Sequence, residues 1–193
     1  MFAVTARLRN VRRDELDGPG QDAYDRLLRG MNSRPGNPST EITGIYGLLL
    51  NRPELAARIG AVGDHILTDG GIELVVKEIT CLAVARELNC QFEWTIHEPV
   101  ARRAGVGEHV IEGVKHRDLA ALVPGERIFV DYAWQVLRNN VTDITWHGIV
   151  KLMGEHGAVN LTVLISFTAL ICYCMDAFEI DLPAGALPLL PIP

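Results

Sequence analysis

The feature that most constrains the fold is a run of 18 residues without a charge, at positions 158–175. A helix of that length is near the lower limit for a membrane span. Polar residues recur through the run, Asp176 follows it directly, and no lysine or arginine cluster flanks it. A helix that is apolar all round can equally lie at the centre of a domain or in a subunit interface. We therefore predict a buried core or interface helix and no membrane partner.

The composition is that of one globular domain. The chain has 193 residues, of which 48% are hydrophobic and 22% charged, which is enough for a sizeable core. We predict a single domain over residues 1–193, with an N-terminal arm at 1–20 and a tail at 182–193. The tail has four prolines and should be extended, in a position to lie on a neighbouring subunit. A net charge of -6 repels phosphate backbones, so we expect no nucleic-acid partner.

Apolar residues recur at helical spacing, and proline or glycine marks several helix ends. Frequent β-branched residues make a strand the alternative for residues 73–76, but the length of the segment and its embedded charges favour a helix. The sequence has no alternation of strands with helices and no phosphate-cradling glycine motif, so we predict an all-α fold. The predicted helices cover residues 21–30, 52–67, 72–89, 91–104, 107–116, 124–137, 144–153 and 158–177, and residues 43–50 are predicted to form a short helix or a turn.

The four cysteines are Cys81, Cys90, Cys172 and Cys174, and none forms a close Cys-x-x-Cys pair. Cys172 and Cys174 should point to different sides of a helix. This usage is typical of a protein with reduced thiols. Residues 1–10 contain no apolar run of the kind found in a signal peptide. We therefore predict a cytoplasmic location.

Residues 90–97 concentrate the groups that can carry chemistry. In a helix, Cys90, Glu93 and His97 would share one face. Glu93 can accept the ring proton of His97 or hold the ring in one tautomer, and the large apolar neighbours favour a buried pair. An ordinary exposed helix pair is the alternative, and a lone cysteine is more often a small core residue than a nucleophile. Glu78 lies twelve residues before Cys90, and solvent or a nearby cation is its default partner.

The last helix offers a second set of polar groups. Thr168, Tyr173 and Asp176 are spaced so that they can share a face and close a pocket opposite Glu93. A polar stripe satisfied within an oligomer interface is the alternative interpretation.

A metal site is the remaining possibility for the 90–97 segment. It would use Glu93 and His97 together with His147 or His156 from later helices. Two ligands four residues apart make only half a site, and no second half is visible. We therefore predict no metal.

The spacing of these residues resembles the carboxymuconolactone decarboxylase / alkylhydroperoxidase D (AhpD-like) superfamily. Its peroxidase members carry Cys-x-x-Cys-x-x-x-His, with a glutamate twelve residues before the first cysteine. Here Glu78, Cys90 and His97 match that pattern, and Glu93 replaces the second cysteine. Roughly residues 20–190 look like the decarboxylase-like branch. The stretches that carry this likeness are RPELA at 52–56, FEW at 92–94, HEP at 97–99, RAG at 103–105, VTD at 141–143 and DAFEI at 176–180, with the proline-rich tail.

The resemblance implies an all-α, AhpD-like fold that forms a homo-oligomer (a dimer, trimer or hexamer) through the long apolar C-terminal helix. It places the site near a subunit interface. A dithiol peroxidase needs a resolving thiol close to the attacking one, and Glu93 stands in that position here. Folding would have to bring Cys81, Cys172 or Cys174 near Cys90, so disulfide cycling is disfavoured.

We therefore predict an enzyme that uses acid–base chemistry without a cofactor. It would decarboxylate or isomerise a small cyclic carboxylated substrate such as a lactone or β-keto acid. His97 would donate the proton, Glu93 would orient it or act as a partner acid, and Glu78 would complete the relay. Trp94, Thr168 and Tyr173 are the predicted substrate-binding residues. An AhpD-like thiol peroxidase that uses Cys90 and a non-catalytic oligomeric binding protein are the alternatives.

Overall fold

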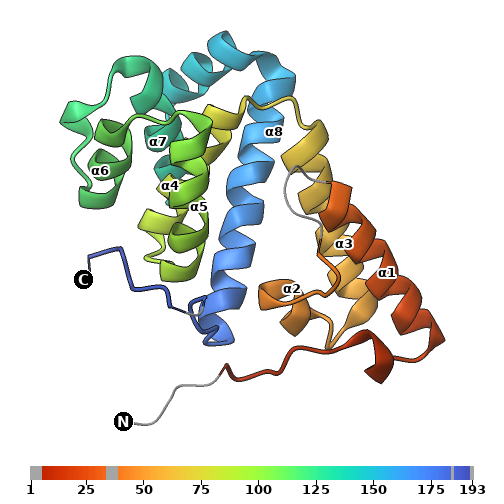
Figure 1. The fold of residues 1–193 in the computed structure, drawn as a ribbon. Helices are drawn as coiled ribbons and strands as arrows, with labels where there is room; N and C mark the ends of the chain where they lie inside the picture. The colour runs from red at the N-terminus through yellow and green to blue at the C-terminus, as the bar shows by residue number, and fades with distance from the viewer. Residues whose placement is uncertain (1–5, 34–38, 184, 192–193) are drawn as a thin grey trace. The chain divides into compact units, whose positions relative to one another are not determined.

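The computed structural model describes residues 6–33, 39–183 and 185–191, and these residues contain helices and connecting segments but no strand. The predicted all-α fold class is thereby confirmed. Short 3-10 turns at Arg13–Glu15 and Leu119–Ala121 and a π-helical turn at His65–Asp69 accompany the α-helices. The α-helices of Figure 1 are α1 Gly18–Ser33, α2 Gly44–Leu49, α3 Pro53–Asp64, α4 Leu74–Glu87, α5 Gln91–Ala104, α6 Glu108–His116, α7 Pro124–Leu137 and α8 Asp143–Ala177.

Helix boundaries follow local chemistry closely. Proline opens α3 and α7 at the first helical position, where its missing N–H costs no hydrogen bond. Gly105 ends α5 in the left-handed conformation. The strand considered for residues 73–76 does not form, because Glu73 is the extended N-cap of α4 and the helix begins at Leu74.

The chain divides into two compact units, which are described separately. The first comprises residues up to 70 together with 177–180, and in it α3 packs against both α1 and α2. The second comprises residues 71–176 together with the tail from 181, and in it α4 packs against α5, α6 and α7. The assignment of residues 1–193 to a single domain stays a prediction.

Helix α4 is the centre of the second unit. All residues from 78 to 85 are buried, which requires neighbours on every side of the helix. The side chain of Leu82 is fully buried, and such burial contributes about 2 kcal/mol. The indole N–H of Trp134 on α7 donates to the carbonyl of Ala83 at 2.9 Å. A carboxylate on α4, Glu78, is therefore placed inside a packed core.

Helix α8 carries the charge-free run. Gly154 has φ 70 and ψ 172, so it separates residues 143–153 from the long apolar part of α8, in the gap between the helices predicted at 144–153 and 158–177. By length and composition α8 is able to cross a membrane, since the mean hydropathy of its most apolar 18 residues is 2.0. Half of those residues are buried inside the molecule. Whether it is a core, interface or membrane helix stays a matter of prediction.

The proline-rich tail lies on the same chain. The side-chain amide of Gln91 donates to the carbonyl of Leu190 at 2.9 Å, and its oxygen accepts from the backbone N–H groups of Leu189 and Leu190 at 3.0 Å. Leu190 is buried. The described tail therefore contacts the first residue of α5 in its own chain. A contact of the tail with a neighbouring subunit stays a prediction.

Candidate acid–base site

The imidazole of His97 lies between two carboxylates. Its Nδ1 is 2.7 Å from Oε2 of Glu78, and its Nε2 is 3.1 Å from Oε1 of Glu93. The side chains of Glu78, Glu93 and His97 are 4%, 9% and 18% exposed. Three titratable groups thus meet in a nearly dry environment, where their mutual interactions are stronger than at the surface.

Two helices supply the three groups. Glu93 and His97 are one turn apart on α5, so their contact follows from helical spacing. Asn89, with φ 53, reverses the chain between α4 and α5, a conformation that asparagine tolerates better than most residues. The backbone N–H of Cys90 then donates to the carbonyl of Ala85 at 2.8 Å. This tight turn folds α5 back on α4 and brings Glu78 against the free ring nitrogen.

The carboxylates favour a charged ring. Burial opposes the imidazolium, but Cys81, Glu93 and Glu78 outweigh it and raise the pKa of His97 well above its usual value. Only the imidazolium can donate from both ring nitrogens, which fits a carboxylate on either side. The site therefore holds a proton at neutral pH that it can give up to a substrate.

Sulfur atoms surround this cluster. The thiol of Cys81 on α4 is 3.8 Å from the hydroxyl of Thr168 on α8. The thiol of Cys90, the N-cap of α5, donates to the thioether of Met175 on α8 at 3.9 Å. Helix α8 thus covers the side of the site where the thiols lie.

Cys90 and Cys172 also interact directly. A hydrogen bond from the Cys172 thiol lowers the pKa of Cys90, burial opposes that shift, and the backbone N–H groups of Glu93 and Phe92 assist it. The same hydrogen bond, together with burial and the charge of Glu93, raises the pKa of Cys172. The two thiols are therefore unequal.

The predicted substrate-binding residues occupy three different environments. Trp94 is fully buried, and its indole N–H donates to Glu98 at 2.6 Å. Thr168 is buried beside Cys81, and Tyr173 is 61% exposed on α8. The structure brings Thr168 to the cluster. The substrate-binding role of all three residues stays a prediction.

Folding adds residues to the site that the spacing of residues 90–97 does not predict. These residues are Cys81 on α4 and Cys172 and Met175 on α8. All three are buried at the cluster. The signal in the sequence is the spacing of Thr168, Cys172 and Met175, which places them on one face of a helix.

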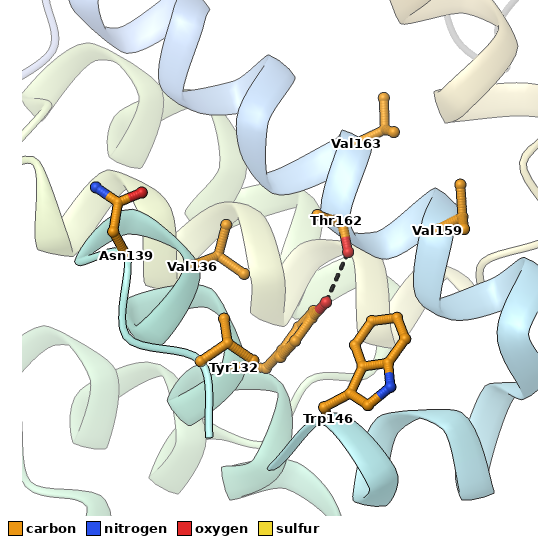
Figure 2. A pocket seen from close by; sticks show the side chains of 8 residues that line it. Tyr132, Val136, Asn139, Trp146, Val159, Thr162 and Val163 are labelled. Atoms are coloured by element: carbon orange, nitrogen blue, oxygen red, sulfur yellow. Dashed lines mark hydrogen bonds between the residues drawn. The ribbon is translucent and has the colours of Figure 1, made fainter. Parts of the chain in front are cut away.

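A separate apolar pocket of about 630 Å³ lies between α7 and α8. Figure 2 shows the hydroxyl of Tyr132 pointing to that of Thr162, with 2.6 Å between the oxygens. Glu93 and His97 are not among its lining residues. Besides Tyr132 and Thr162, the lining includes Trp146, Val136, Val159 and Val163.

Metal ligation has no ready-made site in the described part of the chain. Within residues 6–33, 39–183 and 185–191, no three His, Cys, Asp or Glu side chains are grouped so that they could hold an ion. Glu93 and His97 instead bind each other.

One family model matches part of the chain. Residues 53–135 match the model of the Carboxymuconolactone decarboxylase family, which confirms the resemblance seen in the sequence. The matched range contains Glu78, Cys90, Glu93 and His97, whereas α8 lies outside it. No curated protein matches the chain.

Solved structures show the same fold. A variant of the debrominase Bmp8 in complex with 2,3,4-tribromopyrrole matches with a TM-score of 0.68 and 13% identity, over 95% of this chain and 94% of that one. The ligand-free debrominase matches with a TM-score of 0.69 and 14% identity, over 88% and 90% of the two chains.

Proposed function

We propose that this chain of the carboxymuconolactone decarboxylase family is an acid–base enzyme that works without an added cofactor. It would decarboxylate or isomerise a small cyclic carboxylated substrate. The observation that carries the proposal is the imidazole of His97, which is held at both ring nitrogens by the buried carboxylates Glu78 and Glu93. A histidine placed in this way is a proton donor with an orienting partner on each side.

The two contacts of His97 differ, and the difference supports different roles for the two carboxylates. Glu78 makes the shorter contact, 2.7 Å, and its side chain is almost completely buried, so it is the anchor that orients the ring. Glu93 makes the longer contact, 3.1 Å, and is the more exposed of the two carboxylates. The Nε2–H of His97 would therefore turn from Glu93 to the substrate, and Glu93 would accept or return the proton.

In the decarboxylation the bond between the substrate carbon and its carboxylate breaks and releases carbon dioxide. The electron pair passes into the adjacent carbonyl as an enolate, which positive charge on His97 stabilises. His97 then gives its proton to the carbon, and the ring of His97 takes up a new proton from water. Isomerisation uses the same steps, except that a base removes a proton where the carboxylate would have left.

The size of the substrate is inferred from the fold. The debrominase Bmp8, which shares this fold, forms a complex with 2,3,4-tribromopyrrole, a small ring. The family name points to a carboxylated lactone. Together they support a small cyclic substrate that carries a carboxylate.

The proposal is tested by proton exchange at carbon. Carboxylated lactones and cyclic β-keto acids are incubated with the protein in D₂O, and NMR follows deuterium incorporation and substrate loss. For a compound that reacts, His97→Gln should lower the rate by about 10²- to 10⁴-fold, since a general acid is lost. His116→Gln is the matched control, because Glu112 and His116 form the same i,i+4 pair at 3.2 Å but are exposed.

Full turnover by folded His97→Gln would show that His97 is not the acid. If no compound reacts although several bind, the binding-protein alternative is favoured over an enzyme. Equal losses in the His97 and His116 variants would indicate a general effect on folding and contradict a specific role for the buried pair.

A further inference from the structure

A segment outside any helix lies next to the buried acid–base site. Residues 185–191 come after α8 and belong to the same compact unit as α4 and α5. Figure 1 shows the tail, drawn in dark blue, leaving the end of α8 and running toward α5. The side chains of Glu78, Glu93 and His97 are at most 18% exposed, so a substrate needs a way in. A segment without helical hydrogen bonds can open at a lower free-energy cost than a helix.

The tail is held by the side-chain amide of Gln91, the first residue of α5. The amide oxygen accepts from the backbone N–H groups of Leu189 and Leu190 at 3.0 Å, and the amide nitrogen donates to the carbonyl of Leu190 at 2.9 Å. A side-chain amide has both a donor and an acceptor, so it can pair with a backbone in both directions. Because all three hydrogen bonds come from one side chain, a change of its rotamer releases them together.

Leu190 adds an apolar contact to these hydrogen bonds. Its side chain is 3% exposed, whereas Leu187 on the same tail is 74% exposed. Burial of a leucine side chain favours the closed position of the tail by roughly 10- to 100-fold. The closed position is therefore the dominant one, and opening it requires only that one leucine and one amide be released.

The tail lies at the end of the site where Cys90 is found. Cys90 is the N-cap of α5 and directly precedes Gln91. Its sulfur is 3.9 Å from that of Met175, close to the end of α8 from which the tail departs. Cys90, Glu93 and His97 share one face of α5, so an opening beside Cys90 leads along this face to the imidazole.

A hinge separates the held part of the tail from α8. Gly185 has φ 81, a conformation that is open mainly to glycine. The backbone N–H of Ala186 donates to the carbonyl of Pro183 at 2.9 Å, so the chain turns tightly at this point. A few such residues are enough to absorb the backbone rotation of a moving segment.

We propose that residues 185–191 form a strap that closes over the Cys90 end of the acid–base site and opens to admit the substrate. Gln91 and Leu190 hold the strap closed. Closure would keep bulk water from the enolate, so that the proton comes from His97. The role of the strap rests on the function proposed above, since it is the buried acid–base site that needs a gate.

The closed position is tested on the wild-type protein by hydrogen exchange, followed by NMR. The backbone N–H groups of Leu189 and Leu190 should exchange at least about 10-fold more slowly than in a free peptide of the tail sequence. Gln91→Ala should remove this protection. Gln135→Ala is the matched control, because its amide oxygen also accepts a backbone N–H, that of Thr142 at 3.0 Å. Exchange in the wild type at the rate of the free peptide would overturn the proposal.

Gating is tested by the rate at which iodoacetamide alkylates each cysteine at one fixed pH, measured by mass spectrometry. Leu190→Ala should raise the rate at Cys90 at least about 10-fold, since it removes most of a buried side chain from the strap. Leu187→Ala is the matched control on the same tail and should leave this rate unchanged. Cys81, which is 1% exposed on α4, reports general opening of the core and should also be unchanged.

Two outcomes of the alkylation experiment would contradict the strap. The same rate at Cys90 in Leu190→Ala and wild type would show that the tail does not control access. Equal increases at Cys81 and Cys90 would show a general loss of stability instead of a local opening. Neither measurement needs a substrate, so the strap can be confirmed even if His97→Gln keeps full turnover, and the acid–base function can hold even if the strap fails.

Discussion

At the scale of single residues, the central fact is a buried histidine whose neighbours, Cys81, Glu93 and Glu78, favour its charged form. An isolated buried imidazole would lose its proton, since burial disfavours the charged form. Cys81, Glu93 and Glu78 together reverse that tendency and raise the pKa of His97. The burial of the two carboxylates is tolerated for the same reason, because each of them faces the ring within 3.1 Å.

This arrangement predicts how stability depends on pH. The folded protein keeps the proton of His97 at pH values where the unfolded chain has released it, so the stabilisation is complete below the ordinary pKa of about 6.5. It is lost as the pH rises through the raised pKa of the folded state. Urea unfolding of wild type and His97→Gln should show a difference in unfolding free energy that shrinks above about pH 6.5, with a slope of at most about 1.4 kcal/mol per pH unit. A constant difference up to pH 9 would contradict the charged ring.

At the scale of elements, α8 depends on one glycine. With φ 70 and ψ 172, Gly154 occupies a region open almost only to glycine, and it lets the arm at 143–153 leave the axis of the long apolar part. The helical period of 3.6 predicts both parts from the sequence. The direction of the break is decided by Gly154 and by what each part packs against.

Gly154→Ala should therefore destabilise the protein by about 1–3 kcal/mol through backbone strain. A steric clash does not contribute, because no atom lies within 4 Å of the added methyl group. Gly125→Ala is the control. It also meets open space, but it lies at helical φ in α7, so it should be neutral or stabilising by up to about 1 kcal/mol. Urea unfolding measures both variants, and equal effects would show that the conformation of Gly154 is not strained for alanine.

At the scale of the whole molecule, α8 leaves apolar side chains uncovered. Val159 is 56% exposed, Val163 40%, Leu170 40% and Tyr173 61%. A surface of this kind on one helix is typical of an interface. It agrees with the homo-oligomer that the family resemblance implies, and both the oligomer and its number of subunits stay predictions.

Sedimentation velocity tests this expectation. Wild type should sediment as an oligomer, and Val159→Glu with Val163→Glu should shift the protein toward the monomer, since two carboxylates would be buried without partners. His156→Glu, one turn before Val159 and exposed, is the charge control and should leave the distribution unchanged. If wild type sediments as a monomer, the predicted homo-oligomer is wrong.

The sequence by itself determined what depends on neighbours along the chain. Periodicity predicts the helices, and the four-residue spacing predicts the contact of Glu93 with His97, because both are set by the geometry of one turn. Tertiary structure decided the second partner of His97 and the second thiol of the site. Glu78 and Cys172 come from other helices, α4 and α8, and Cys172 is 82 residues from Cys90 in the sequence. No spacing rule links such positions, since only the packing of α8 and α4 around α5 brings their side chains within reach.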